Sequence, residues 1–170
     1  MRHKLFIGND WVEPAEGMYF PDVDPATEEP TVEIARGTAP DVDRAVRAAK
    51  AAMRGPWQKL TPAERGGLLF KLADLVGGAR EELAAIETKD MGKPLSQARG
   101  DVDGVVATLR YNAGAADKME GDTIPVGPEV IDFTLLEPLG VTAHIVPGTI
   151  LSAWPYARSP RRSPPAARPS

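Results

Sequence analysis

The sequence predicts an α/β fold that is incomplete, with short strands first, then helices, then further strands. Residues 5–36 hold short apolar runs separated by glycine, proline and acidic residues, a pattern typical of strands and turns. Apolar residues recur with helical periodicity over residues 38–118, and β-rich runs return after Gly121. A parallel sheet needs helices on both faces and further strands beside it. We therefore expect residues 1–147 to be the opening section of a larger fold.

The composition is that of a folded protein. Of 170 residues, 42% are hydrophobic and 26% are charged, which excludes a disordered chain. The sequence has no apolar run of about eighteen residues, so neither a transmembrane helix nor a membrane partner is expected. The apolar stretch behind the basic start covers only residues 5–7. That is too short for the core of a secretory signal, so we expect a cytoplasmic location.

Two capping boxes mark the starts of the first two predicted helices. Asp41 follows Thr38 at a distance of three residues, and Glu64 follows Thr61 in the same way. Each threonine and carboxylate can therefore exchange hydrogen bonds around a helix start. The spacing predicts helices over residues 38–53 and 61–76. Their expected buried stripes are Val42, Ala45, Val46, Ala49 and Met53 in the first, and Leu68, Leu69, Leu72, Leu75 and Val76 in the second.

Two more helices and two strands are predicted further along the chain. The helices cover residues 80–90 and 95–118, and β-rich runs at 130–136 and 141–146 predict the strands. The second strand would hold His144 as a structural residue. The residues expected on the buried faces of the two helices are Leu83, Ile86 and Glu87, and Val102, Val105, Val106, Leu109 and Tyr111.

Cysteine is absent from the sequence, and that excludes several kinds of chemistry. Without a thiol, these residues can form no disulfide framework, thiolate metal site or cysteine nucleophile. The two histidines, His3 and His144, are too few for a histidine-rich metal site. Asp101 and Asp103 lie in opposite phases of their predicted helix and are expected to form a solvated face. We therefore nominate no catalytic residue and no metal ligand.

Residues 148–170 differ in composition from the rest of the chain. They contain four arginines and five prolines but no Asp, Glu or Lys, whereas the whole chain has a net charge of −4. Prolines at this density exclude a helix interior or a central strand, so we expect a disordered tail after the domain of residues 1–147. The acidic net charge gives no reason to expect nucleic-acid binding. An arginine-rich tail that binds an acidic partner is an alternative.

Six stretches of residues 5–147 together resemble the N-terminal part of the aldehyde dehydrogenase superfamily. They are FPDVDPAT (20–27), DVDRAV (41–46), RGGLLFKLADL (65–75), ETKDMGKP (87–94), LRYNAGAADK (109–118), and EPLGV (137–141) running into IVP (145–147). Each stretch alone is a weak signal, and their common order and spacing carry the resemblance. It implies the N-terminal part of that family's cofactor-binding domain, with the first strands of a Rossmann-like fold and a β-hairpin arm for oligomerisation.

The resemblance implies an enzyme that oxidises an aldehyde to a carboxylic acid with NAD or NADP. In this family a cysteine thiolate attacks the aldehyde, hydride passes to the nicotinamide, and the thioester is hydrolysed. Ile145, Val146 and Pro147 resemble the strand end that lies against the dinucleotide, so they are the expected cofactor-binding residues. A plain buried strand is the alternative for them. The nucleophile and most of the cofactor pocket have no counterpart in these residues, so we expect this chain alone to be inactive and to bind no cofactor.

The resemblance stops at Pro147. Members of the family continue with Trp-Asn, and that asparagine holds the oxyanion, whereas Gly148 follows Pro147 here. Restoring one T before the codon of Gly148 permits the reading Trp-Asn-Tyr-Pro-Leu-Gly-Met-Ala. We therefore hypothesise that one base is missing and that residues 148–170 are read out of frame.

A non-catalytic interaction protein is a hypothesis from another class. It would pair with a full-length relative through residues 130–136, the segment that resembles the oligomerisation hairpin. An exposed β-prone edge pairs readily with another chain. The resemblance implies homo-oligomers for the intact family, and we expect a fragment with uncovered apolar surface to aggregate.

Overall fold

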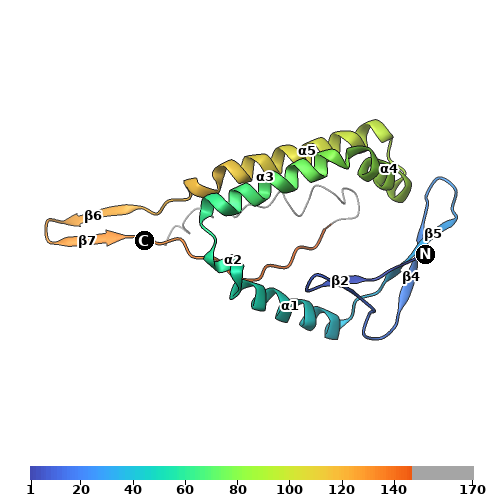
Figure 1. Cartoon of the computed structure of the whole chain (residues 1–170), viewed down its shortest axis with the longest axis horizontal. Coiled ribbons are helices and arrows are strands. Elements are labelled where there is room, and N and C mark those ends of the chain that lie inside the picture. Colours follow the sequence, from blue (N-terminus) through green and yellow to red (C-terminus); the bar gives the residue numbers. More distant parts are fainter. Residues whose placement is uncertain (147–170) are drawn as a thin grey trace, which may run out of the picture.

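The N-terminal strands form two small sheets in the computed structural model, which describes residues 1–146 (Figure 1). One sheet has the order β1-β5-β4, with β1 parallel and β4 antiparallel to β5. The other is the β2–β3 hairpin, whose turn residues Gly8 and Asn9 both have positive φ, 65° and 71°. Positive φ at both positions is typical of a type I′ turn. The strands are β1 (Arg2–His3), β2 (Leu5–Ile7), β3 (Asp10–Val12), β4 (Tyr19–Val23) and β5 (Pro30–Ala35).

Both predicted capping boxes are present at the helix starts. The Thr38 N–H donates to Asp41 Oδ2 over 3.0 Å, and the Thr61 N–H donates to Glu64 Oε2 over 2.7 Å. Asp41 also accepts the Ala15 N–H over 3.0 Å, which ties the loop after β3 to the helix start. The helices are α1 (Ala39–Met53), α2 (Pro56–Lys59), α3 (Pro62–Gly78), α4 (Arg80–Met91), α5 (Leu95–Ala115) and the 3₁₀ helix η1 (Ala116–Lys118).

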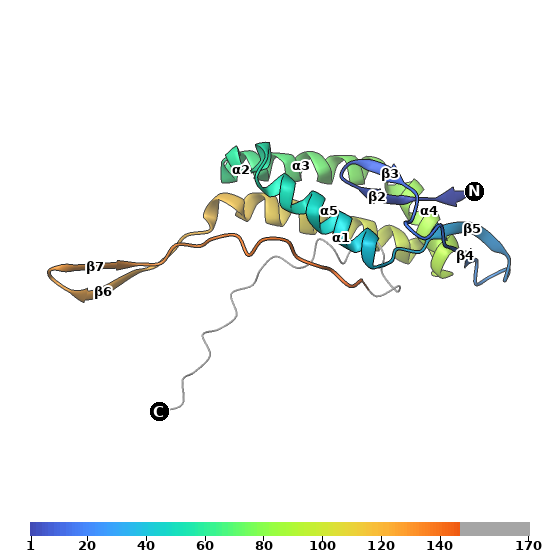
Figure 2. The same cartoon turned by 90° about the horizontal axis from the view of Figure 1, so that it is seen from below.

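The hydrophobic core lies where α3 and α4 pack on α5 (Figure 2). Within residues 1–146, the fully buried apolar side chains larger than alanine are Val102, Val105 and Leu109 of α5. Ala73 of α3 packs with Val105 and Leu109, and Ala84 of α4 packs with Ala98 and Val102 of α5. Small side chains at these positions let the helix axes approach closely.

Several side chains that the periodicity predicts as buried are exposed. Val42 of α1 is 59% exposed, Leu75 of α3 is 72% exposed, and Tyr111 of α5 is 77% exposed. The positions of the helices are predicted correctly. The predicted burial of these side chains is wrong, because no described element covers these helix faces. Helical periodicity identifies an apolar face but not the element that packs on it.

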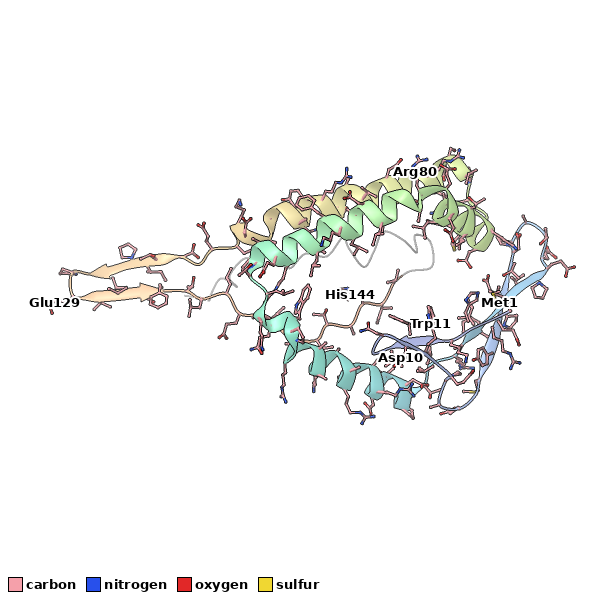
Figure 3. The ribbon with its side chains drawn as sticks, viewed as in Figure 1. Met1, Asp10, Trp11, Arg80, Glu129 and His144 are labelled. Atoms are coloured by element: carbon pink, nitrogen blue, oxygen red, sulfur yellow. The ribbon has the colours of Figure 1, made fainter. Side chains whose placement is uncertain are left out.

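The predicted strand at 141–146 is not formed, and this corrects the expectation for the first Rossmann-like strands. The segment is neither helix nor strand, and His144 on it is exposed rather than buried (Figure 3). A strand needs a partner to satisfy its backbone hydrogen bonds. No described strand lies beside residues 141–146.

A second hairpin extends beyond the end of the helices. Strands β6 (Thr123–Gly127) and β7 (Val130–Phe133) pair antiparallel, and every residue of both is exposed. Glu129 marks the tip of this arm, at the opposite end of the molecule from Met1 (Figure 3). The structure confirms a strand within residues 130–136 and shows it in a hairpin, as the resemblance implies, whereas the range of its partner β6 was not predicted. Among the described residues, none of the helices is long and apolar enough to span a bilayer.

Candidate functional site

The predicted cofactor-binding residues lie at the end of the described segment. Ile145 is 94% exposed and Val146 is partly buried, while Pro147 lies outside the described residues. Both described residues belong to an extended segment without strand partners. Their role towards a dinucleotide therefore stays a prediction.

The most concentrated polar chemistry lies at the turn between α4 and α5. Gly92 ends α4 with a φ of 70°, and its N–H donates to the Thr88 carbonyl over 2.8 Å. The left-handed conformation is one that glycine adopts without strain. Pro94 then begins the next helix as its N-cap. This tight turn places Lys93 between the end of α4 and the first turns of α5.

Lys93 bridges two carboxylates. Its Nζ lies 2.6 Å from Glu87 Oε1 of α4 and 2.6 Å from Asp101 Oδ2 of α5. The exposed fractions of the three side chains are 14% for Lys93, 4% for Glu87 and 29% for Asp101. We call these three residues the Lys93 bridge. It shows that Asp101 lies partly buried and ion-paired, which corrects the expectation that it belongs to a solvated face.

The charges of the bridge exclude a nucleophilic lysine. Burial by itself lowers the pKa of Lys93, but the hydrogen bonds to Asp101 and Glu87 outweigh burial, so the pKa is raised. A nucleophilic lysine must lose its proton near neutral pH. Lys93 therefore holds its proton more tightly than a free lysine does, and its two ion pairs join α4 to α5.

A carboxyl pair joins the same turn to the N-terminal sheet. Burial raises the pKa of Asp90, and a hydrogen bond with Asp22 of β4 raises it further. The Thr31 hydroxyl donates to Asp22 Oδ2 over 2.7 Å. Gly92 lies close to Pro25. A Cβ added to this glycine would be 2.8 Å from Pro25 Cγ. The Lys93 bridge joins α4 to α5, and the close approach of Gly92 and Pro25 places the loop after β4 against the same turn.

This arrangement is a structural joint between elements. Glu87 accepts a hydrogen bond from Lys93 Nζ over 2.6 Å. Residues 1–146 contain no group of three or more His, Cys, Asp and Glu side chains that could hold a metal ion. The break at residues 91–94 is visible in the sequence, but the pairing of Asp22 with Asp90 is a long-range contact with no local signal.

The fold is that of an incomplete α/β protein, with a helical unit, two small N-terminal sheets and a hairpin arm. The model of the aldehyde dehydrogenase family matches residues 11–148, and the chain belongs to this family. Retinaldehyde dehydrogenase 3 from Rattus norvegicus is 45% identical over 160 residues, covering 91% of this chain and 31% of the relative. An aldehyde dehydrogenase from Aspergillus niger is 42% identical over 157 residues, covering 92% and 32%.

Solved structures show the same partial coverage. A protein described as an aldehyde dehydrogenase from Burkholderia cenocepacia matches with a TM-score of 0.87 and 46% identity over 90% of this chain and 32% of its own. The NAD+ complex of an aldehyde dehydrogenase from Bacillus cereus matches with a TM-score of 0.79 and 39% identity, over 82% and 29%. The chain thus spans about a third of the length of these relatives, and the similarity confirms the predicted family and the incomplete α/β fold.

Proposed function

We propose that this chain supplies the N-terminal scaffold of an NAD(P)-dependent aldehyde dehydrogenase. The observation that carries the proposal is the TM-score of 0.87 at 46% identity over 90% of the chain. In the complete enzyme, an aldehyde would be oxidised to a carboxylic acid through a cysteine thioester. The scaffold's own contribution is the helix joint and the hairpin arm, since these residues contain no cysteine.

A chimera tests this proposal. Residues 11–146 replace the matched segment at the start of the Burkholderia cenocepacia protein, and NADH formation from a small aliphatic aldehyde is followed at 340 nm. We expect the chimera to retain activity, because the matched segments share one fold. A chimera that folds as the parent does and is inactive would overturn the proposal.

The 170-residue chain by itself should not oxidise aldehydes. A thioester cannot form without a thiol, and the sequence contains none. The measurement is NADH or NADPH production by the purified chain. Aldehyde-dependent reduction of either cofactor would contradict this expectation.

Residues 148–170 do not contribute to this function in our proposal, because we infer that they are read out of frame. Nucleotide sequencing through the codon of Pro147 and beyond that of Ser170 tests this inference. One added base should open a long frame that begins Trp-Asn and later contains a cysteine. If no frame continues in this way, the tail belongs to the protein, and deletion of residues 148–170 would then show whether it binds an acidic partner.

A second candidate function is pairing with a full-length relative through residues 130–136. The observation in its favour is the exposed β7 edge, on which Ile131 is 85% exposed and Phe133 58% exposed. Within residues 1–146, β7 pairs with β6 and leaves its other edge open. Co-purification with an intact aldehyde dehydrogenase would support this function. Equal recovery of the chain and an Ile131→Pro variant would contradict it.

A further inference from the structure

The hairpin arm formed by β6 and β7 contains two different strand registers (Figure 1). Towards the base of the arm, Pro125 lies opposite Ile131, whereas at the tip Gly127 lies opposite Val130. Two residues of β6 therefore advance where β7 advances by one, and Val126 is the extra residue of a β-bulge. The bulge joins the register of the base to the register of the tip.

A second pairing of the same two strands is available without the bulge. If the pairing at the tip continued directly along the strands, Val126 would lie opposite Ile131, and Ile124 would lie opposite Phe133. In the observed register, Ile124 lies opposite Asp132. Because side chains alternate between the two faces of a strand, this shift of one residue would turn β7 over relative to β6. It would also exchange the backbone groups that β7 presents at its open edge.

Three residues at the base of the arm hold the observed register. The Thr134 N–H donates to the Asp122 carbonyl over 2.9 Å, and the Asp122 N–H donates to Thr134 Oγ1 over 2.8 Å. A Cβ added to Gly121 would overlap the Thr134 carbonyl oxygen, so this close approach requires glycine. We call Gly121, Asp122 and Thr134 the base clasp. Asp122 and Thr134 each lie two residues from the pair of Ile124 and Asp132, so the base clasp continues the register of that pair.

Small energies decide between the two registers. Every residue of β6 and β7 is exposed, and an isolated two-stranded hairpin is marginally stable in water. The two-residue turn at 128–129 fixes the pairing at the tip alone. One net hydrogen bond shifts such an equilibrium by about threefold to tenfold. The hydrogen bonds of the base clasp are therefore strong enough to select the bulged register.

We propose that the base clasp is a register lock, which determines the face and the edge of β7 that the arm offers to another chain. In the locked register, Pro125, Ile131 and Phe133 share one face of the arm, and Ile124 and Asp132 share the other. Without the clasp, the arm would take the register that has no bulge. The lock lies within this chain, so it goes beyond the proposed enzyme and does not depend on it.

Disulfide trapping measures the register in the full 170-residue chain, which has no cysteine of its own. The double variant Ile124→Cys/Asp132→Cys reports the observed register, and Ile124→Cys/Phe133→Cys reports the register without the bulge. Directly opposite residues lie within the Cα distance that a disulfide spans, whereas side chains on opposite faces point apart. After oxidation of dilute protein in a glutathione buffer, mass spectrometry gives the intramolecular disulfide fraction of each variant. We expect the first pair to oxidise more completely than the second.

Thr134→Val removes the hydroxyl group that accepts the Asp122 N–H and keeps the shape of the side chain. It should lower the ratio of the first disulfide to the second by about threefold to tenfold. Gly121→Ala should lower the same ratio by about fivefold to a hundredfold, because its Cβ overlaps a backbone carbonyl. Thr123→Val is the matched control, because it makes the same substitution in the same arm outside the base clasp, and it should leave the ratio unchanged.

The ratio distinguishes a change of register from simple loss of the hairpin. A shift from the first disulfide to the second in Thr134→Val, but not in Thr123→Val, would support the register lock. An unchanged ratio in Thr134→Val would overturn it, and so would an equal loss of both disulfides. Equal trapping of the two pairs with the clasp intact would also overturn it.

Discussion

Alanine at Gly66 and alanine at Gly67 are expected to change stability in opposite directions. Both glycines lie in the first half of α3, and alanine is favoured over glycine in a helix interior by about 1 kcal/mol. A Cβ on Gly67 meets no atom within 4 Å, so Gly67→Ala should gain about this amount. A Cβ on Gly66 would lie 2.6 Å from the Ala113 carbonyl oxygen and 3.4 Å from Ala116 Cβ.

The close contact at Gly66 decides whether Gly66→Ala stabilises or destabilises the chain. The Ala113 carbonyl belongs to the backbone of α5, so it can move away only if the helix moves. Overpacking of this kind costs about 1–3 kcal/mol, which exceeds the propensity gain over most of its range. Gly66→Ala should therefore destabilise the α3–α5 packing by up to about 2 kcal/mol.

Urea unfolding of the full chain, followed by far-UV circular dichroism at 222 nm, measures both changes. Gly67→Ala should raise the urea midpoint and Gly66→Ala should lower it. If Gly66→Ala raises the midpoint as much as Gly67→Ala does, the close approach of α3 and α5 is not present in solution.

Three further predictions concern the joint and one strained turn. Lys93→Met removes the cation that pairs with buried Glu87 and should cost about 3 kcal/mol, measured as a lower urea midpoint. Folding raises the pKa of Asp90, which lies beside Asp22. The folded state therefore binds the Asp90 proton more tightly than the unfolded state does. The stabilisation that this proton gives is lost as pH rises through the raised pKa. Asp90→Asn should therefore raise the free energy of unfolding at pH 7 but not at about pH 3. An equal increase at both pH values would contradict this prediction. Glu28 has a φ of 59° in the turn between β4 and β5, so Glu28→Gly should gain about 0.5–1 kcal/mol, and a lower midpoint would show that this turn is not strained.

Local signals in the sequence predict the helices well. The capping boxes at Thr38 and Thr61 predict where α1 and α3 begin, and both boxes are formed. These predictions succeed because each depends on side chains three residues apart. The one-turn helix α2 was not predicted, because the pair Gly55-Pro56 indicates the end of a helix. In the structure Pro56 is instead the first residue of α2, a position that proline suits.

Long-range contacts limit what the sequence predicts about the site. Residues 141–146 have the composition of a strand, but a strand forms only beside a partner, and no described strand lies beside them. Tyr111 fits the helical period of α5 and is 77% exposed. The Lys93 bridge could be predicted in part from the sequence, because its three residues lie within 15 positions of one another. The contact of Asp22 with Asp90 depends on the tertiary fold alone.

The alanine-rich seam between α3, α4 and α5 has a consequence for the order of folding. These three helices are consecutive in the chain, so their packing needs no element outside residues 62–115. The parallel pairing of β1 with β5 joins Arg2 to Glu33, within a separate N-terminal part of the chain. During synthesis, this helical unit can therefore pack as soon as residue 115 has left the ribosome. The exposed Leu68 and Leu75 of α3 are then open to chaperones, proteases and other nascent chains.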